Sequence, residues 1–532
     1  MVSPTHIGSD DPSTTTASGM AAVTLDIASA IQTALEFHQS GRLPQADAIY
    51  QQILQAEPNH PDALHLSGLI ALQSRKSEAA VELIGRAIRE NPSSAFYYNN
   101  LGLAFQNLGK FNEMVLNFRK AVELEPAFPE AHYNLGNALR ELGNLDAAAD
   151  SYRQAISFMP EYVEAHSNLG LVFQSQGKLD AAAECFRKAI SLEPEYAELH
   201  YNLGNALQDQ GKLDSAAECY RQAISLEPDY AEPHNNLGKT LQRQGMTDAA
   251  IACYRQAIAF RPDFAEAHYN LGSALKEHGK TEEALASYRQ VIELEPNNEG
   301  VKYLIATLTG GTYERVPDQH IEQVFDNYAD RFDQHLVNDL DYKTPQELVS
   351  LVKQIRGTPT AAEWDVLDLG CGTGLVGAEI SPYAKKLVGV DLSEKMLAKA
   401  RERNIYHSLI RSELLTMMRN ESTSSYDVIT AADVFIYLGK LDEIISEAKR
   451  LLRKGGLFAF SAEAIEELPS EEKGQESSDD YKLNPTGRYA HSVSYLNRLA
   501  TTNGYKSLKI ISSQARLEKG QPVKAWLVIW EN

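Results

Sequence analysis

The sequence predicts a multidomain protein in which an all-α superhelix of repeats precedes an α/β domain with a doubly wound sheet. Three observations support this prediction. Prolines recur every 34 residues through the first half, strand and helix patterns alternate through the second half, and a glycine-rich run follows one of the strands. At 532 residues the chain is also too long for one ordinary core.

Composition and charge exclude several classes of protein. The chain is 43% hydrophobic and 23% charged, as in folded globular proteins, and its net charge of -22 without a dense basic stretch predicts no nucleic-acid partner. No 18-residue apolar run and no signal-like start occur, so we expect no membrane insertion and a cytoplasmic location. Residues 1–26 are rich in Ser, Thr and Asp, and we expect them to be disordered.

The first half of the chain contains eight units of 34 residues, over residues 27–298. A small residue in the first helix of each unit lets an aromatic residue of the second helix approach, and a proline then ends the second helix. No unit can bury its apolar face alone, so neighbouring units must stack. The prolines are Pro58, Pro92, Pro126, Pro160, Pro194, Pro228, Pro262 and Pro296. The period and pattern resemble those of tetratricopeptide (TPR) repeats.

An asparagine stands two residues before the glycine of the first helix in six successive units. These residues are Asn100, Asn134, Asn168, Asn202, Asn236 and Asn270. The resemblance implies that this position faces the concave groove, where an asparagine ladder can hold an extended peptide, because an amide both donates and accepts hydrogen bonds. A protein or peptide ligand is therefore expected. The alternative is that each asparagine ties one helix to its neighbour.

Histidines and cysteines also follow the 34-residue period, and they suggest a metal array at first sight. We interpret both series as packing residues. The cysteines of stacked repeats lie too far apart to share a metal or form disulfides, and the histidines stand where the resemblance implies a large aromatic residue that packs inside the first helix. No metal site is predicted. The residues are His132, His166, His200, His234 and His268, with Cys185, Cys219 and Cys253.

Residues 299–318 are expected to form a helix that caps the repeats, followed by a linker at Gly310 and Gly311. From residue 319 onward, helix and strand patterns alternate, and the chain ends in an antiparallel hairpin. Helices are expected at 320–336, 344–355, 393–403 and 441–452. Strands are expected at 366–370, 386–392, 426–434 and 455–463, with the hairpin over 507–530.

The run VLDLGCGTG, with Gly370, Gly372 and Gly374, raises a choice between a dinucleotide and another nucleotide-like cofactor. Together with the strand order, it makes residues 319–532 resemble the Rossmann-like class I S-adenosylmethionine-dependent methyltransferases. The resemblance implies that Asp368 binds the ammonium group of S-adenosyl-L-methionine and that the glycines lie beside its methionine and ribose. It also places Asp391, followed by Leu392, at the ribose hydroxyls.

Further site residues carry over from the same resemblance. Glu413 and Leu414 match the adenine site, and Asp433 lies where the segment 432–439 approaches the transferable methyl group. Tyr437 is expected near the acceptor. Tyr328 and Phe332 are expected in an amino-terminal lid over the cofactor, where aromatic faces suit a sulfonium cation; the alternative is that they only pack a helix onto the sheet.

Methyl transfer of this kind needs orientation and exclusion of water more than a metal or a nucleophilic side chain. A base matters only for an acceptor that arrives protonated, and His491 is the candidate, with capping of a helix as its alternative role. The sequence therefore predicts a methyltransferase whose repeats recruit a peptide or protein substrate. Two alternatives stay open: a metabolite or glycan acceptor, with the repeats used for assembly, and a scaffold that binds the cofactor without turnover.

Overall fold

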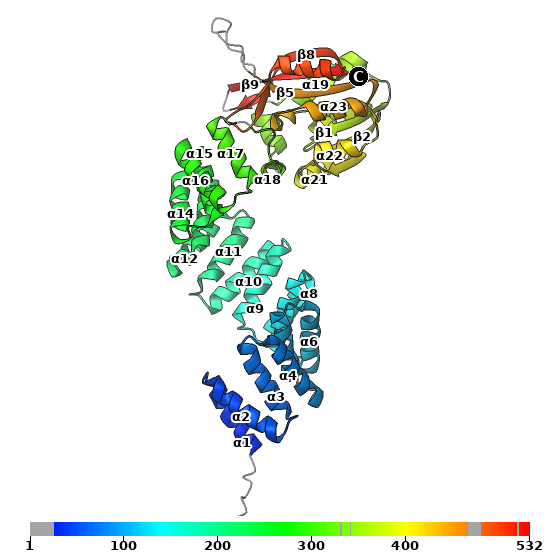
Figure 1. Ribbon diagram of the computed structural model, residues 1–532. Coiled ribbons are helices and arrows are strands. Elements are labelled where there is room, and N and C mark those ends of the chain that lie inside the picture. Colours follow the sequence, from blue (N-terminus) through cyan, green and yellow to red (C-terminus); the bar gives the residue numbers. More distant parts are fainter. Residues whose placement is uncertain (1–25, 312, 330–331, 341, 466–479, 519–520) are drawn as a thin grey trace, which may run out of the picture. The chain divides into compact units, whose positions relative to one another are not determined.

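The computed structural model describes residues 26–311, 313–329, 332–340, 342–465, 480–518 and 521–532. The expectation of disorder for residues 1–26 therefore falls outside it, except at Asp26. The chain divides into two compact units, Met1–Gly245 and Met246–Asn532, which are described separately (Figure 1).

The first unit is a succession of helix pairs, one pair for each predicted repeat, up to the first helix of the seventh repeat. Its helices are α1 (Ile27–Gln39), α2 (Leu43–Ala56), α3 (Pro61–Gln73), α4 (Ser77–Glu90), α5 (Ala95–Asn107), α6 (Phe111–Leu124), α7 (Pro129–Glu141), α8 (Leu145–Phe158), α9 (Val163–Ser175), α10 (Leu179–Leu192), α11 (Ala197–Asp209), α12 (Leu213–Leu226) and α13 (Ala231–Arg243). The second unit begins with four more helices of the same series. They are α14 (Thr247–Phe260), α15 (Ala265–Glu277), α16 (Thr281–Leu294) and α17 (Glu299–Thr309).

The packing of small against aromatic residues is as the sequence predicts. A Cβ added at Gly204 in α11 would lie 2.6 Å from the ring of Tyr220 in α12, and one at Gly170 would lie 2.7 Å from Phe186. Only glycine therefore lets the two helices of these pairs approach so closely. Each second helix ends two residues before its proline; α2, for example, ends at Ala56 ahead of Pro58.

The periodic histidines are hydrogen-bonded within the repeats. The Nε2 atoms of His132, His166, His200, His234 and His268 lie 2.9 to 3.0 Å from the carbonyl oxygens of the prolines six residues earlier. Among the periodic cysteines, Cys185 and Cys219 are free thiols, and burial raises the pKa of both to about 11. Among the described residues, no group of His, Cys, Asp and Glu could hold a metal ion.

The rest of the second unit is built on a mixed sheet, which has nine strands within the described residues. They are β1 (Trp364–Leu369), β2 (Ala384–Asp391), β3 (Ser408–Arg411), β4 (Tyr426–Ala431), β5 (Leu452–Ala464), β6 (Tyr481–Leu483), β7 (Tyr489–His491), β8 (Lys506–Glu518) and β9 (Gln521–Glu531). The order is β3-β2-β1-β4-β5-β7-β6, parallel from β3 through β5 to β7, and β9 adds antiparallel to β5 with β8 beyond it. The predicted hairpin is confirmed, whereas β3, β6 and β7 were not predicted.

Helices cover both faces of this sheet, which makes the sheet doubly wound as predicted. One core cluster joins the sheet to α22 (Leu414–Asn420), α23 (Asp442–Leu451) and α24 (Val493–Thr502). The other joins it to α19 (Thr344–Arg356) and α20 (Leu375–Ile380). The helix α21 (Glu394–Glu402) contacts β2 and β3, and short 3-10 turns lie at η3 (Ser381–Tyr383) and η4 (Phe435–Tyr437).

The segment predicted as one helix over 320–336 is divided. It forms α18 (Asp318–Tyr328) and then a π-helix, η2 (Gln334–Asp339). The π-helix places His335 beside Tyr328, and the Nδ1 atom of His335 is hydrogen-bonded to the Tyr328 hydroxyl.

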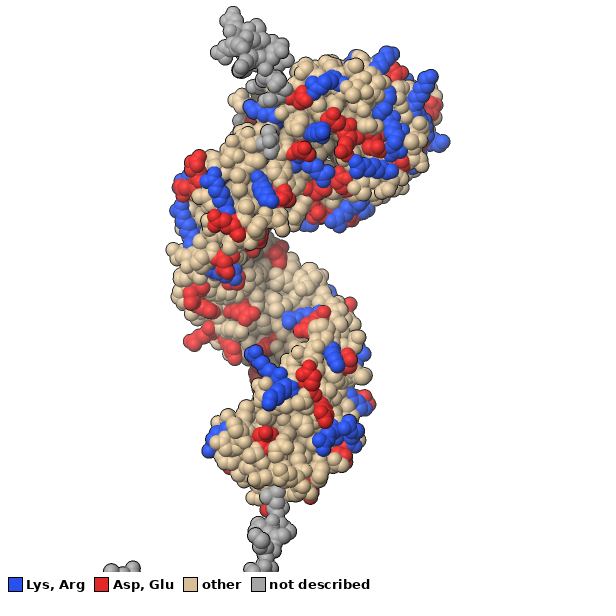
Figure 2. Space-filling view, viewed as in Figure 1, with Lys and Arg blue, Asp and Glu red and all other residues tan. Residues whose placement is uncertain are grey.

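Within the described residues, no helix combines the length and apolar character needed to cross a membrane. On the face shown in Figure 2, Lys and Arg are interspersed with Asp and Glu. This face therefore shows no broad basic surface of the kind that nucleic-acid binding requires.

Candidate functional site

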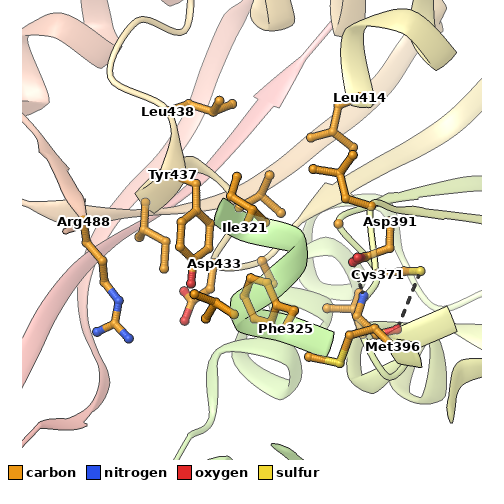
Figure 3. A pocket seen from close by; sticks show the side chains of 18 of the residues that line it. Ile321, Phe325, Cys371, Asp391, Met396, Leu414, Asp433, Tyr437, Leu438 and Arg488 are labelled. Carbon is orange, nitrogen blue, oxygen red and sulfur yellow. Dashed lines mark hydrogen bonds between the residues drawn. The ribbon is translucent and has the colours of Figure 1, made fainter. Parts of the chain in front are cut away.

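The candidate site is a cavity of about 550 Å³ in the second unit, at the carboxyl ends of β1, β2 and β4 (Figure 3). In open α/β sheets, ligands bind at this edge, where the direction of winding reverses. Here the reversal lies between β1 and β4. The strands β2 and β3 extend the sheet on one side of β1, whereas β4 and β5 extend it on the other side.

The glycine loop between β1 and α20 forms one wall of the cavity. Gly370, Gly372 and Gly374 have φ angles of 60°, 53° and 90°, which favour glycine. Nothing lies within 4 Å of the place that a Cβ on Gly372 would take, whereas a Cβ on Gly370 would lie 2.5 Å from Val434. The main chain at Gly372 thus faces open space, and Gly370 is needed for packing. Gly374 does not line the cavity.

Asp391 ends β2 and lines the cavity beside this loop. Its Oδ2 atom accepts a hydrogen bond from the Gly372 amide and its Oδ1 atom accepts one from the Ser393 amide, both at 2.9 Å. Because each carboxylate oxygen keeps a further lone pair, the side chain can fix the loop and still accept a bond from a ligand hydroxyl.

Asp368 does not lie on the cavity wall, which does not fit the predicted contact with a cofactor. Its side chain is 1% exposed, and its two oxygens accept bonds from the Tyr406 hydroxyl at 2.7 Å and the Thr430 hydroxyl at 2.8 Å. Burial raises the pKa of Asp368 to about 6. The carboxyl group therefore joins β1, β4 and the segment before β3 behind the glycine loop.

Leu392, Glu413 and Leu414 also line the cavity. Glu413 caps α22, because its Oε2 atom accepts a bond from the Thr416 amide at 2.7 Å, and its Oε1 atom lies 3.2 Å from Nη1 of Arg315. The predicted adenine residues are thus on the wall, and the Glu413 carboxylate is fixed by two partners.

Aromatic side chains of α18, together with Phe332 before η2, line the cavity. Tyr328 and Phe332 both line it, and their ring centroids are 5.2 Å apart. Phe325 lies edge-on to Phe332 at 6.0 Å and to Tyr437 at 5.6 Å. Ion pairs and hydrogen bonds fix this segment, among them Asp333 with Arg403 and Asp326 with Ser393. The predicted lid residues are therefore brought to the cavity.

Asp433 and Tyr437 lie at the other end of the cavity from Asp391 (Figure 3). Asp433 follows β4 with a φ of 55°, which is strained for a residue other than glycine. Its amide donates to the Ser461 hydroxyl at 2.8 Å, and that hydroxyl donates to its Oδ1 atom at 2.9 Å. The neighbouring sheet strand thus holds the strained residue in place.

His491 lies in the core and not in the cavity, so its predicted role as a base is not supported. It is 0% exposed, its Nε2 atom is 3.0 Å from the Gly439 carbonyl oxygen, and its ring stacks on Tyr495. Burial lowers its pKa to about 4. The alternative of helix capping is also wrong, because Ser492 is the N-cap of α24.

Several residues of the cavity wall were not predicted from the sequence. Arg516 comes from β8, and His335 comes from the π-helix. Arg488, in the turn before β7, also lines the wall. No local motif could have identified Arg516, because it reaches the cavity only through the pairing of the terminal hairpin with β5.

The asparagine series lies between repeats. Nδ2 of Asn168 is 2.9 Å from Oδ1 of Asn137 in the preceding repeat, and Nδ2 of Asn236 is 2.9 Å from Oδ1 of Asn205. Nδ2 of Asn134 donates to Oδ1 of Asn99, and that of Asn100 pairs with His65. These contacts are those of the alternative interpretation, in which each asparagine ties neighbouring helices.

Asn202 and Asn270 occupy the equivalent positions in α11 and α15. Asn202 is buried, and its Nδ2 atom has no hydrogen-bond partner within the described residues. The reason is local, because Ser167 and Leu171 stand where Tyr133 and Asn137 serve Asn168.

Comparison with known proteins agrees with this division of the chain. Residues 367–460 match the family model described as a methyltransferase domain. Residues 32–95 and 265–298 match tetratricopeptide repeat models, and a further TPR model matches five segments between residues 107 and 279.

Similar proteins include two curated relatives that are named as methyltransferases and one solved structure. Over 152 residues the chain is 31% identical to malonyl-acyl-carrier-protein O-methyltransferase of Halalkalibacterium halodurans, covering 27% of this chain and 55% of that protein. It is 26% identical to thiol S-methyltransferase TMT1B of Rattus norvegicus, covering 43% and 81%. The crystal structure of MamA is 28% identical, covers 30% of this chain and 95% of that one, and has a TM-score of 0.29.

The chain thus spans about half the length of the first of these curated relatives, 55%. Repeat models match helix pairs that the structure forms, and the methyltransferase model spans β1 to β5, including the glycine loop and Asp391. The chain is therefore a tetratricopeptide-repeat protein that carries a class I methyltransferase domain.

Proposed function

We propose that this chain is an S-adenosyl-L-methionine-dependent methyltransferase whose repeats bind a protein or peptide, either the substrate or a partner that delivers it. The observation that supports the cofactor most directly is the open space at Gly372 beside the Asp391 carboxylate. A cofactor whose ribose bonds to Asp391 and whose neighbouring atoms lie against the Gly372 main chain fits there. When bound, it would supply an activated methyl group.

The residues of the chain would perform three tasks. Asp391 would accept bonds from the ribose hydroxyls, and Leu392, Glu413 and Leu414 would form the adenine end. Tyr328, Phe332 and Phe325 would exclude water and face the sulfonium cation with aromatic rings. Asp433 and Tyr437 would border the acceptor. Because the charge of the methyl donor is dispersed as the reaction proceeds, orientation in a dry cavity is the main requirement.

Charge also favours this cofactor over a dinucleotide. Asp391, beside the glycine loop, would repel a pyrophosphate there and Glu413 would do so at the adenine end, whereas both attract a sulfonium and an ammonium group. The glycine motif alone does not make this distinction, because dinucleotide-binding proteins share it.

The test is calorimetric titration of the full chain with S-adenosyl-L-methionine and, separately, with NAD. We expect micromolar affinity for the first only, and a loss of about tenfold or more in Asp391→Ala, since removing an acceptor from a charged hydrogen bond costs about 1.5 to 3 kcal/mol. Asp391→Asn, which keeps one oxygen acceptor, should lose less.

The matched control is Glu402→Gln, which removes an exposed carboxylate of α21 whose nearest ion-pair partner is 3.9 Å away. Its affinity for S-adenosyl-L-methionine should equal that of the wild type. Binding of NAD without binding of S-adenosyl-L-methionine would contradict the proposal.

Relatives named for O- and S-methylation differ in the acceptor atom. The resemblance therefore concerns the cofactor half of the site, and the acceptor must be inferred from this chain's own residues. For the repeats, the proposal rests on the presence of an array of the kind that binds proteins.

A further inference from the structure

Two arginines meet at the end of the cavity away from Asp391. Arg516 on β8 is 3% exposed, and Arg488 lies in the turn before β7; both line the wall. The Arg488 guanidinium interacts with the Tyr437 side chain. Figure 3 shows Arg488, Asp433 and Tyr437 on one side of Phe325, and Cys371, Asp391 and Met396 on the other.

Arg516 is a buried guanidinium whose contacts are long. Its Nη1 atom is 3.4 Å from Asp433, and its Nη2 atom is 3.3 Å from Glu463 and 3.7 Å from Glu518. Its Nε atom is buried without a hydrogen-bond partner in the described part of the chain. Short charge-assisted bonds measure about 2.7 to 2.9 Å, and a buried charge is costly unless it is well paired. The Arg516 guanidinium can therefore still form hydrogen bonds to an anion.

Within the cluster of Arg488, Arg516 and Asp433, the charges that face the cavity have a positive excess. Arg488, Arg516 and Asp433 line the wall, which gives two positive charges and one negative charge. Glu463 and Glu518 contact the same guanidiniums but do not line the cavity. An anionic ligand would thus meet the arginines from the cavity while these two glutamates hold them from outside it.

Apolar groups adjoin the arginines. The Leu517 amide, next to Arg516, donates to the Leu340 carbonyl oxygen at 2.9 Å, and Leu340 and Tyr342 line the wall. Phe325, between the two ends, also lines the cavity, and its ring centroid is 5.6 Å from that of Tyr437. The site therefore suits an anion that carries an apolar body.

We propose that Arg488 and Arg516 bind the methyl acceptor by a carboxylate group, so that the substrate is a carboxylic acid. This rests on the proposed methyltransferase function. A planar carboxylate matches the guanidinium fork in a way that an amine, a thiol or a neutral hydroxyl does not. The acceptor can be a small acid or a carboxyl group of a protein, and the chemistry of recognition is the same.

A carboxylate acceptor would need no base at the arginine end of the cavity. The acceptor oxygen forms the new C–O bond to the methyl carbon, the C–S bond of the methyl donor breaks, and its electron pair stays on sulfur. No proton is removed, because the acid is already ionised near neutral pH. The product is a methyl ester. A phenol, thiol or amine would need a proton acceptor, and guanidinium groups cannot serve as one.

The first experiment measures binding without turnover. Saturation-transfer NMR on the full chain would compare hexanoate with hexanamide, which has the same body and no charge. We expect binding of hexanoate only, and an affinity reduced about tenfold or more in Arg488→Gln, the equivalent of about 1.4 kcal/mol. Arg488 is partly exposed, so this variant should fold. The control, Arg498→Gln, removes an exposed arginine that pairs with Asp480, and should bind as the wild type does.

Equal binding of hexanoate and hexanamide, no binding of either, or an unchanged affinity in Arg488→Gln would overturn the carboxylate site. Titration of the same samples with S-adenosyl-L-methionine keeps the two proposals apart. Hexanoate binding without cofactor binding would contradict the proposed function alone, and cofactor binding without hexanoate binding would contradict the carboxylate site alone.

The second experiment identifies the product class. The full chain would transfer isotope-labelled methyl groups into a cell extract divided by dialysis into macromolecules and small molecules. Methyl esters release their label as methanol in mild alkali, and the labelled fraction shows whether the acid is a protein or a small molecule. Label that resists alkali in both fractions would refute the carboxylate acceptor and favour a base-dependent one, for which the hydrogen-bonded pair Tyr328 and His335 is the candidate.

Discussion

At the scale of single residues, burial decides which of the conspicuous side chains can act on a ligand. Asp368 and His491 belong to motifs that indicate function, yet both lie in the core, where two hydroxyl groups donate to the Asp368 carboxylate and Nε2 of His491 lies 3.0 Å from the Gly439 carbonyl oxygen. Asp391 has the same residue type as Asp368 and ends the neighbouring strand, but it lines the cavity. The difference is one of position relative to the glycine loop.

The raised pKa of Asp368 predicts a specific dependence of stability on pH. In the unfolded chain its carboxyl group titrates near 3.9, and in the folded chain near 6. Between these values the folded state binds more protons, so this group makes the free energy of unfolding fall as the pH rises from about 4 to about 6, and the effect is constant above. In Asp368→Asn the contribution is absent.

Urea unfolding at several pH values, followed by tryptophan fluorescence, measures this effect. The three tryptophans, Trp364, Trp526 and Trp530, all lie in strands of the sheet, so the signal reports on that part of the chain. We expect the stability of Asp368→Asn, relative to the wild type, to increase from pH 4 to pH 6. Parallel curves for the two proteins would show that the folded-state pKa is not raised.

At the scale of elements, the repeats depend on close contact between the two helices of each pair. A methyl group at Gly204 would lie 2.6 Å from the Tyr220 ring, and both residues are buried. Because the ring is held between helices, the helices must separate to admit the methyl group. Overpacking of this kind costs about 1 to 3 kcal/mol.

We therefore expect Gly204→Ala to lower the midpoint of urea unfolding, followed by the helical circular dichroism signal. Gly85→Ala is the matched control, because a Cβ at Gly85, inside α4, would meet only the end of Arg89 at 4.0 Å. There the change should stabilise the helix by up to about 1 kcal/mol. Equal effects of the two substitutions would show that helix propensity, and not the contact with Tyr220, governs the result.

In the asparagine series, the residues of the preceding repeat decide whether an asparagine bonds across the repeat boundary. Asn168 and Asn236 bond across the repeat boundary because an asparagine stands 31 residues earlier in each case, at Asn137 and Asn205. Asn202 has Leu171 at that distance, and its amide nitrogen has no such bond. A regular sequence series thus produces an irregular pattern of contacts.

At the scale of the whole molecule, charge limits the class of partner. The net charge of -22, with basic and acidic residues interspersed on the face in Figure 2, opposes binding to a polyphosphate backbone. In an electrophoretic mobility-shift assay at 50 mM salt, we expect no retardation of duplex DNA or single-stranded RNA at protein concentrations up to about 100 µM, the weak end of non-specific binding. Retardation that disappears as the salt rises would reveal a basic surface and contradict this expectation.

The sequence by itself determined the repeats and the type of the second fold. A period of 34 residues requires a stack of identical helix pairs, and alternating strand and helix patterns require a parallel sheet covered on both faces. Gly370, Gly372, Asp391, Glu413, Tyr328 and Phe332 were also identifiable, because the resemblance to class I methyltransferases assigned them to the cofactor site, and they line the cavity. These features depend on local patterns.

Only the tertiary structure decided which of the remaining residues face the cavity. The short strands β3, β6 and β7 carry too few residues for a clear alternation, and they form because longer strands offer them edges. Arg516 reaches the site through the pairing of the terminal hairpin with β5, across more than fifty residues of chain. Burial of Asp368 and His491 depends in the same way on residues distant in sequence, and no spacing along the chain encodes it.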